Sequence, residues 1–464
     1  MSNRRPHRLV VLLVIFIVFG SAAPAAWAAP TASNELPVVA IPETPAGMQL
    51  AWAIAQINGD AASLEADDVG EHVAAAFLAA LPAPDLIAIL QNLTAPLAPV
   101  TVARFEGGVS RTRANALLFT RSGHQWRVRL GVDAEPPYLI NDLFFEPVAV
   151  PEPVARPPTS WKGLDSRLQK VAPEVGFVAA EVSDGACRPL NEVNADEPMA
   201  IASAFKLYVL GALADAVAAG EFDWDDPLPI NQELRSLPNG EMRLEADGSA
   251  FPIRTYAEQM MASSDNTATD HLITLLGRER VEAYMAAMGH EQPELNRPLL
   301  LTREWFALKL RYTEGELADY LDLSETEKRR FLADEVDPVA ATLSEVEQWL
   351  GPNEIKTIEW FASAGDLCRA TASLHAQAQQ TGLSPIYDAL SLNPGVAWDA
   401  ETWRYVGFKE GYETGVKSYA WLLQRADGRW FALTAIINDP SEEIDGFHLR
   451  QLMVTAVDLL AKEQ

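Results

Sequence analysis

Cysteine is almost absent from this chain of 464 residues, which contains only Cys187 and Cys368. Two cysteines do not make the disulfide framework of a small secreted domain. Cys187 lies in a turn-forming stretch and Cys368 in a helical pattern, so we treat both as packing residues and leave their pairing open. The seven histidines are scattered, with no His-x-x-x-His spacing and no paired-cysteine motif. We therefore expect no zinc site, no other metal and no cofactor.

Basic residues are scarce as well. The chain has 36 lysines and arginines against 64 acidic residues, which gives a formal net charge of −28. Such an acidic balance argues against binding to nucleic acid or to an anionic membrane surface. The simplest interpretation of the acidic balance is solubility, and it does not indicate a fold.

Long uncharged runs are missing except at the N-terminus. There, three arginines precede an uncharged stretch that ends in a small-x-small pattern: Arg4, Arg5 and Arg8, then Leu9–Ala29, with Ala26-Trp27-Ala28 near its end. This order predicts a secretory signal peptide over residues 1–29 and an exported protein that is extracellular, at the cell surface or periplasmic. The alternative is an uncleaved membrane anchor, because the uncharged run is long enough to span a bilayer. After cleavage we expect no membrane span.

Proline-rich stretches divide the rest of the chain. Residues 30–44 are rich in proline, alanine and threonine and predict a tether. Residues 148–158 are again rich in proline and predict a stiff linker. We therefore expect two domains, a small one over residues 45–147 and a larger one over residues 159–464.

The small domain shows helical patterns first and strand patterns afterwards. Helices are expected at Ala46–Asn58 and Val69–Asn92, the second broken near Pro82–Pro84. Strands are expected at Val100–Phe105, Arg113–Thr120, Gln125–Val132 and Tyr138–Phe145, with a hairpin turn at Ser122-Gly123. Helices followed by an antiparallel meander indicate an α+β domain.

The large domain has strand patterns at both ends and helical patterns between them. Strands are expected at Val175–Val182, Arg404–Gly411, Ser418–Gln424 and Trp430–Ile437. Helices are expected at Trp161–Val171, Arg303–Leu310, Ser324–Glu335, Leu343–Leu350, Ala364–Gln379 and Phe447–Ala461, and Leu390–Trp398 is expected to be a loop. This order indicates one antiparallel sheet with helices on both sides, again an α+β fold.

The stretch from Ala202 to Ala214 carries the first candidate for chemistry. Small residues lead into a strong helix former, so Ser203 is expected at a helix N-terminus, with Lys206 on the same face. A serine hydroxyl becomes a good nucleophile when a base lies beside it, and a buried lysine near a second cation can be that base. Ser-x-x-Lys by itself is common and also fits an ordinary helix start.

A second motif lies between two helical runs. Ser264-Asp265-Asn266 should form a loop whose side chains face a cleft, although the same letters also fit an ordinary turn and helix cap. In a cleft, the hydroxyl of Ser264 can pass on a proton, and the amide of Asn266 can orient a substrate. A third motif, Lys409-x-Gly411, ends a strand pattern.

These three motifs in this order resemble the superfamily of serine β-lactamases and penicillin-binding proteins, and class A β-lactamases in particular. The stretch Met-x-x-Ser-Ser-Asp-Asn-Thr-Ala that begins at Met260 strengthens the resemblance. The spacing between the second and third motifs is longer than in ordinary class A enzymes, which implies an inserted helical segment. The two-domain layout resembles the cephalosporin-esterase-like proteins of clavulanate clusters, which implies a steroid-isomerase-like first domain.

The resemblance implies roles for the motif residues. Ser203 would be acylated, Lys206 would be its base, Ser264 would relay a proton, and Lys409 would add positive charge. Further substrate contacts would come from Asn266, from Gly411, and from Tyr412, whose backbone N–H would form an oxyanion hole with that of Ser203.

Two positions depart from the family pattern. Glu410 stands where the family has a hydroxyl that binds the substrate carboxylate, and it would repel that carboxylate unless it points away or pairs with an arginine. Gln292 stands where the family has its deacylating glutamate, which leaves Glu294 as a possible deacylation base beside the alternative of a solvated loop.

The sequence thus predicts a β-lactamase-like serine hydrolase that acts through an acyl-serine on β-lactams or on related amides and esters. One alternative is a D-Ala-D-Ala peptidase or a penicillin-binding protein with slow or no turnover, acting on cell-wall peptides. A second is a binding protein without turnover, which would need neither lysine nor Ser264.

Overall fold

The structure is a computed structural model that describes residues 41–59, 64–120, 125–148, 157–237, 240–336, 341–342, 345–346, 351–395, 399, 401–444 and 446–463. Several sequence predictions therefore fall wholly or mostly outside the described residues. They are the signal peptide, the tether, the Ser122-Gly123 turn, the proline-rich linker and the helix at Leu343–Leu350. The chain divides into two compact units, residues 1–149 and residues 150–464.

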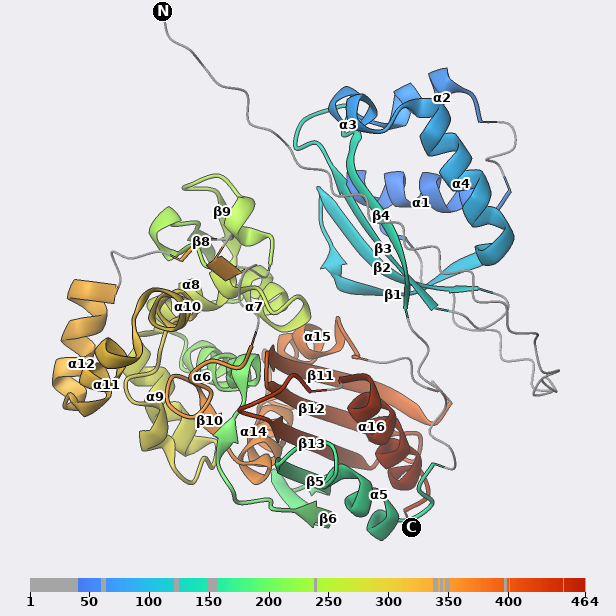
Figure 1. The fold of residues 1–464 in the computed structure, drawn as a ribbon. Helices are drawn as coiled ribbons and strands as arrows, with labels where there is room; N and C mark the ends of the chain where they lie inside the picture. Colours follow the sequence, from blue (N-terminus) through green and yellow to red (C-terminus); the bar gives the residue numbers. More distant parts are fainter. Residues whose placement is uncertain are drawn as a thin grey trace, which may run out of the picture. The chain divides into compact units, whose positions relative to one another are not determined.

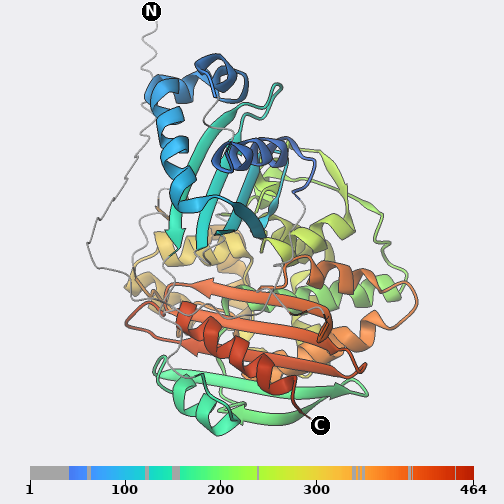
Figure 2. The ribbon, with the colours of Figure 1, turned by 90° about the vertical axis from the view of Figure 1, so that its right-hand side faces the viewer.

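The first unit is a four-stranded antiparallel sheet with helices packed on it (Figures 1 and 2). Its helices are α1 (Pro45–Ile57), α2 (Ala66–His72), α3 (Ala75–Ala80) and α4 (Ala83–Leu97), and its strands, which neighbour one another in chain order, are β1 (Val100–Val109), β2 (Arg113–Thr120), β3 (Gln125–Val132) and β4 (Ile140–Val148). Apolar side chains of α1 and α4, among them Leu50 and Leu90, form a core with the inward side chains of the strands. The α+β prediction for this unit is confirmed.

One helix prediction in the first unit was too long. The expected helix Val69–Asn92 is three helices, with the expected break near Pro82 and an additional one at Val73 and Ala74. Val73 forms a parallel bridge with Ile140, and the N–H of Ala74 donates to the Ile140 carbonyl at 2.9 Å. These contacts with β4 hold the backbone extended and therefore end the helix.

The second unit is built on a five-stranded antiparallel sheet, visible as the red and green strands of Figures 1 and 2. Its strands lie in the order β11-β12-β13-β5-β6. Their bounds are β5 (Glu174–Ser183), β6 (Ala186–Val193), β11 (Trp403–Glu413), β12 (Val416–Arg425) and β13 (Trp430–Asn438), and two small sheets pair β7 (Met199–Ala200) with β10 (Phe361–Ala362) and β8 (Pro227–Pro229) with β9 (Ala250–Pro252). The first and last parts of the domain thus meet in one sheet, as predicted.

Helices cover both faces of this sheet. On one face lie α5 (Trp161–Leu168) and α16 (Gly446–Leu460), which share a buried core with the strands. The other face carries a larger core and most of the helices: α6 (Lys206–Ala218), α7 (Ile253–Ala262), α8 (Asn266–Leu276), α9 (Arg278–Ala287), α10 (Thr302–Arg311), α11 (Glu314–Asp322), α12 (Glu325–Phe331), α14 (Ala364–Ala378) and α15 (Pro385–Ser391). The predicted arrangement of a sheet between helices is confirmed.

Helix α6 lies in the middle of the larger core. Ten of its residues are buried. The helix is apolar on nearly every side, and a helix of this kind is stable only when all its sides are buried. Its first residue, Lys206, is fully buried. The fold therefore carries an amine into a core from which water is excluded.

Helices α11 and α15 were not predicted. α11 begins with a capping box in which the Thr313 and Glu316 side chains cap each other's backbone N–H groups, a signal that is readable from the sequence. α15 has only seven residues, so its periodicity is too short to stand out. The described residues of this unit also contain five short turns of other helix types: η2 (Ala202–Phe205), η3 (Gln232–Leu234), η4 (Met242–Leu244), η5 (Pro293–Asn296) and the π-helical η6 (Leu332–Val336).

The interpretation of Cys187 and Cys368 as separate packing residues was wrong. The two residues form a disulfide between β6 and α14, with their Cα atoms 6.2 Å apart and their positions 181 apart in sequence. They are brought together because α14 packs on β5 and β6. The sequence contains only this one possible pair, but nothing in it shows that two positions so far apart meet in space.

Within the described part of the chain, no helix is both long and apolar enough to cross a membrane. The same residues contain no group of three or more potential metal ligands.

Candidate active site

The turn η2 presents Ser203 just before α6 begins. Ser203 lies in a 3₁₀ turn, in which residues three apart lie on the same side, so Ser203 and Lys206 share a side of the turn. Ala202 has φ = +43°, a left-handed conformation that costs a non-glycine residue energy. Its N–H donates to Glu359 Oε2 at 3.3 Å. Surrounding contacts thus hold the turn in a conformation that the sequence does not favour locally.

Lys206 is surrounded by oxygen atoms of the second motif. Its Nζ lies 2.7 Å from the Ser264 carbonyl oxygen, 2.7 Å from Asn266 Oδ1 and 3.0 Å from Ser264 Oγ. Burial, followed by the charge of Lys409, lowers the pKa of Lys206 well below its usual value. The first two partners can only accept hydrogen bonds. A neutral amine therefore donates to both of them and keeps its lone pair for a hydroxyl.

Ser264 joins the two lysines. Lys409 Nζ lies 3.0 Å from Ser264 Oγ and 2.6 Å from the Glu410 carbonyl oxygen. Ser264 itself has φ = +57°, the second strained non-glycine residue in the site. Burial lowers the pKa of Lys409 to about 8, so this amine still carries a proton at neutral pH. Residues that are 145 positions apart thus meet at one hydroxyl.

The orientation of the Asn266 amide is fixed by its two partners. Its Nδ2 donates to the Leu237 carbonyl at 2.6 Å, so its Oδ1 faces Lys206. Asp265 caps α8 through the N–H of Ala268 and also accepts from the N–H of Met242. Ser264-Asp265-Asn266 therefore lies on the loop that ends at the start of α8, as predicted.

Gly411 packs directly against the Ser203 turn. A Cβ atom at this position would lie 2.0 Å from the Ile201 carbonyl oxygen and 2.9 Å from the Ala204 nitrogen. Ser418 on the neighbouring strand donates to the same Ile201 carbonyl at 2.6 Å. The glycine thus allows β11 to approach the turn that carries Ser203 closely.

On the expectation from the sequence that Ser203 is acylated, Gly411→Ala should slow ester cleavage by about 10- to 100-fold, because displacing a reacting group by about 1 Å costs rates of that order. The added methyl group must move the backbone on either side of Ser203. Rates of p-nitrophenolate release from an ester measure the effect. Gly315→Ala is the matched control, since a Cβ there meets nothing within 4 Å. An unchanged rate in Gly411→Ala would contradict the assigned close contact.

A pocket of about 240 Å³ opens beside Ser203. It is lined by residues of η2, α8, α10 and the end of β11: Ala202, Ser203, Asn266, Thr302, Trp305, Phe306, Val346, Trp360, Tyr412, Glu413 and Thr414. Of the residues predicted to bind substrate, Asn266 and Tyr412 line it, whereas Gly411 lies behind the turn. Tyr412 is 52% exposed and shares the pocket with Ser203, as an oxyanion-hole partner must.

Glu410 pairs with an arginine, which is one of the two possibilities that the sequence allowed. Arg450 Nη2 of α16 lies 3.4 Å from Glu410 Oε2, and Arg450 Nη1 donates to the Gly395 carbonyl. Glu410 is not among the described residues that line the pocket. Its carboxylate is therefore paired with a cation on the α16 side of β11.

Glu294 does not join the other predicted residues. It is exposed in the turn η5 and does not contribute to the described lining of the pocket. The turn is held at its other end by Asn296, which bonds to both the N–H and the carbonyl of Phe361 on β10. The structure thus brings together Ser203, Lys206, Ser264, Asn266, Lys409 and Tyr412, and it leaves the possible deacylation base outside.

A buried charged group beneath the pocket was not predicted. Lys309 of α10 lies between two glutamates, with Nζ at 3.0 Å from Glu359 Oε1 and at 2.8 and 2.9 Å from the two carboxylate oxygens of Glu413. Trp305 Nε1 also donates to Glu359 at 3.0 Å. In the sequence, Lys309 and Glu359 look like ordinary surface charges. Glu413 gives the one local signal, because it follows Lys409 by four residues on one strand, and side chains four apart on a strand lie on the same face of the sheet.

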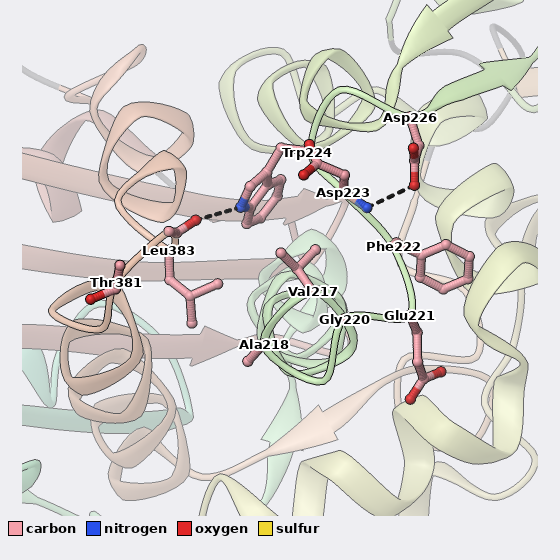
Figure 3. A pocket seen from close by; sticks show the side chains of 11 residues that line it. Val217, Ala218, Gly220, Glu221, Phe222, Asp223, Trp224, Asp226, Thr381 and Leu383 are labelled. Atoms are coloured by element: carbon pink, nitrogen blue, oxygen red, sulfur yellow. Dashed lines mark hydrogen bonds between the residues drawn. The ribbon is translucent and has the colours of Figure 1, made fainter.

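A second hollow, of about 430 Å³, lies at the opposite end of α6 (Figure 3). Figure 3 shows Trp224 reaching across it, where its Nε1 donates to the Gly382 carbonyl at 2.9 Å. Glu221 on its rim is paired with Arg280. None of the motif residues is among those that line it. The larger hollow is thus separate from the candidate active site, about 20 Å away along a helix of 13 residues.

Family models match both units. Residues 161–344 match the model described as "Beta-lactamase enzyme family", and residues 41–136 match the model described as "ORF 12 gene product N-terminal". The first match contains Ser203, Lys206 and Ser264, whereas Lys409 lies beyond it. The search of curated proteins gave no match.

Solved structures with a similar fold include two named proteins. PBP-A is 17% identical, with a TM-score of 0.44, and the match covers 66% of this chain and 98% of that one. A β-lactamase from Sphaerobacter thermophilus DSM 20745 is 18% identical, with a TM-score of 0.44, and the match covers 64% of this chain and 96% of that one. At this level of similarity these structures carry no argument about function, and the likeness of the second unit to the β-lactamase enzyme family rests on the family model that matches residues 161–344.

Proposed function

We propose that the second unit is an exported serine hydrolase that cleaves amide or ester bonds through an acyl-serine intermediate. The observation that carries this proposal is the convergence of Lys206 and Lys409 on Ser264 Oγ, each at 3.0 Å, behind a pocket that Ser203 lines. A binding protein would gain nothing from burying two amines at this position, because burial of each costs free energy.

In the proposed reaction, Ser203 Oγ attacks the acyl carbon and gives up its proton to neutral Lys206. Ser264 gives its hydroxyl proton to the leaving nitrogen or oxygen as the bond between that atom and the acyl carbon breaks, and it receives the proton held by Lys206 in return. The backbone N–H groups of Ser203 and Tyr412 stabilise the oxyanion, a contribution of roughly 2.7–4 kcal/mol per donor. Charged Lys409 keeps Lys206 deprotonated and stabilises negative charge in the transition state.

Hydrolysis of the acyl-enzyme is expected to be the slow step of the proposed cycle. Gln292 replaces the deacylating glutamate of the family, and Glu294 is exposed and outside the described pocket lining. We therefore expect a long-lived acyl-enzyme with β-lactams. This favours a penicillin-binding protein or a D-Ala-D-Ala peptidase as the second candidate function.

Export is part of the proposal. The signal-peptide pattern of residues 1–29 motivates it, and the Cys187–Cys368 disulfide supports it, because disulfides persist in oxidising compartments. N-terminal sequencing of the protein recovered from a secreting host tests it. A mature protein that still starts at Met1 would favour the membrane-anchored alternative.

Intact-mass spectrometry tests the acyl-serine directly. We expect the wild-type protein to gain the mass of one opened benzylpenicillin or nitrocefin, or one acyl group from a p-nitrophenyl ester. Ser203→Ala should gain nothing, and Ser166→Ala, which removes an exposed serine of α5, should behave as wild type. The lifetime of the adduct separates rapid turnover from trapping. Equal adduct formation in wild type and Ser203→Ala would reject the nucleophile.

A further inference from the structure

The walls of the pocket beside Ser203 are largely aromatic. Trp305, Phe306, Trp360 and Tyr412 all line it. The rings support one another, because Trp305 and Trp360 stack with centroids 5.5 Å apart, and Phe306 meets Trp305 edge-on at 4.6 Å. Phe205, behind them, stacks on Trp360 at 4.0 Å. A wall of mutually packed rings offers a flat, apolar surface that suits another ring.

The only acidic residue among the described lining residues is Glu413, and it shares the ammonium of Lys309 with a second buried carboxyl group, that of Glu359. Its side chain is 3% exposed, and those of Lys309 and Glu359 are fully buried. One ammonium thus serves two carboxylates. A substrate carboxylate placed in this pocket would be a third carboxyl group beside a single ammonium, in surroundings where water screens charge poorly.

No positive charge lines the pocket to offset this. Among the described residues that line it, none is a lysine, an arginine or a histidine. Lys206 and Lys409 are 0% and 1% exposed, and their amines bond to protein oxygens. Arg450 bonds to Glu410 and to the Gly395 carbonyl. The described lining of the pocket therefore offers no cation to a carboxylate on the substrate.

From these features we infer that the pocket accepts an uncharged aromatic side chain of the acyl group and discriminates against an aromatic side chain that carries a carboxylate. This inference rests on the proposed acyl-serine chemistry for its biological meaning, but it concerns binding and can be measured separately. Rings of the substrate lie against Trp305 and Trp360. Glu413 repels an anion, and Thr414 at the lining faces neutral polar atoms.

Two ligand pairs that differ in one substituent test this inference. The first pair is 4-methylphenylacetamide and 4-carboxyphenylacetamide, titrated against Ser203→Ala with tryptophan fluorescence as the signal. The second pair is the p-nitrophenyl esters of the same two acids, used with the wild-type protein. We expect the neutral amide to bind at least tenfold more tightly and the neutral ester to acylate Ser203 at least tenfold faster.

The variant Glu413→Gln should reduce both preferences to within about threefold, since it leaves one carboxylate for one ammonium. The matched control is Glu443→Gln, which removes the same charge from an exposed residue bonded to the Tyr412 hydroxyl. That variant should keep the wild-type preference.

The outcomes separate the two proposals. Equal binding of the two amides, or tighter binding of the anion, overturns the inference whether or not the esters react. A tenfold preference in binding without any acyl adduct would support the inference and reject the acyl-serine mechanism. An adduct that forms equally fast from both esters, together with equal binding, would leave the mechanism standing and reject the inference.

Discussion

Replacing Lys206 with methionine should slow acylation of Ser203 by about 10²- to 10⁴-fold, the range that a general base contributes. The methionine side chain is about as long as that of lysine and is apolar, so it is tolerated in a buried position and the fold should persist. What is lost is the amine that lies 3.0 Å from Ser264 Oγ and 2.7 Å from Asn266 Oδ1. Stopped-flow release of p-nitrophenolate measures the acylation rate.

Lys206→Arg separates the base from the charge. A guanidinium stays protonated in proteins, so this variant keeps the positive charge and cannot accept a proton. We expect it to be as slow as Lys206→Met. Recovery of the wild-type rate in Lys206→Arg would mean that charge alone, and not proton transfer, is required.

The pH profile of the wild type should have two limbs. The pKa of Lys206 lies well below its usual value because of burial and the charge of Lys409, so acylation should rise as pH increases through that lowered pKa. Lys409 loses its proton near pH 8. Above that pH the site loses its remaining positive charge, and the rate should fall. A profile that keeps rising past pH 9 would contradict the role of Lys409.

Lys309→Met should lower the free energy of unfolding by about 3–5 kcal/mol, which is the usual cost of leaving a buried charge without its partner. The change leaves Glu359 and Glu413 buried together with no cation. Urea unfolding followed by circular dichroism measures the effect. By contrast, Glu413→Gln leaves one carboxylate for one ammonium and should cost about 1 kcal/mol or less.

The pH dependence of this loss gives a second check. Burial and the neighbouring Glu359 raise the pKa of Glu413 well above its usual value. A carboxyl group whose pKa is raised by folding destabilises the folded state when pH is above that pKa. The penalty disappears once pH falls below the pKa of the unfolded chain. Lys309→Met should therefore lose less stability at pH 4 than at pH 8.

The matched control for Lys309→Met is Lys356→Met. Lys356 pairs with Glu174, and its side chain is 51% exposed. An ion pair that water screens contributes about 1 kcal/mol at most. Similar losses in Lys356→Met and Lys309→Met would show that the buried group carries no special weight in stability.

Much of the candidate site could be predicted because its residues occur in local motifs. Ser203 and Lys206 are three residues apart, and Ser264 and Asn266 flank a helix start, so each pair is positioned by its own turn. Lys409 could be added through the family resemblance and the strand pattern that ends at Gly411. The structure then brings these separate turns together around Ser264.

The residues that sequence analysis missed act across long separations. Glu359 contacts Ala202 from 157 positions away, and Lys309 contacts Glu413 from 104 positions away. Charged residues of this kind are usually solvated, and no local pattern marks the few that fold into the interior. The disulfide was missed because it too joins residues that are far apart in sequence, 181 positions from each other.

The left-handed backbone at Ala202 and Ser264 has a consequence for engineering. Each of these residues costs the native state energy that a glycine would not. Glycine at position 202 should therefore make the protein more resistant to heat, while loosening the turn on which Ser203 depends. Selection for thermal stability alone should therefore favour substitutions at Ala202 that lower the catalytic rate.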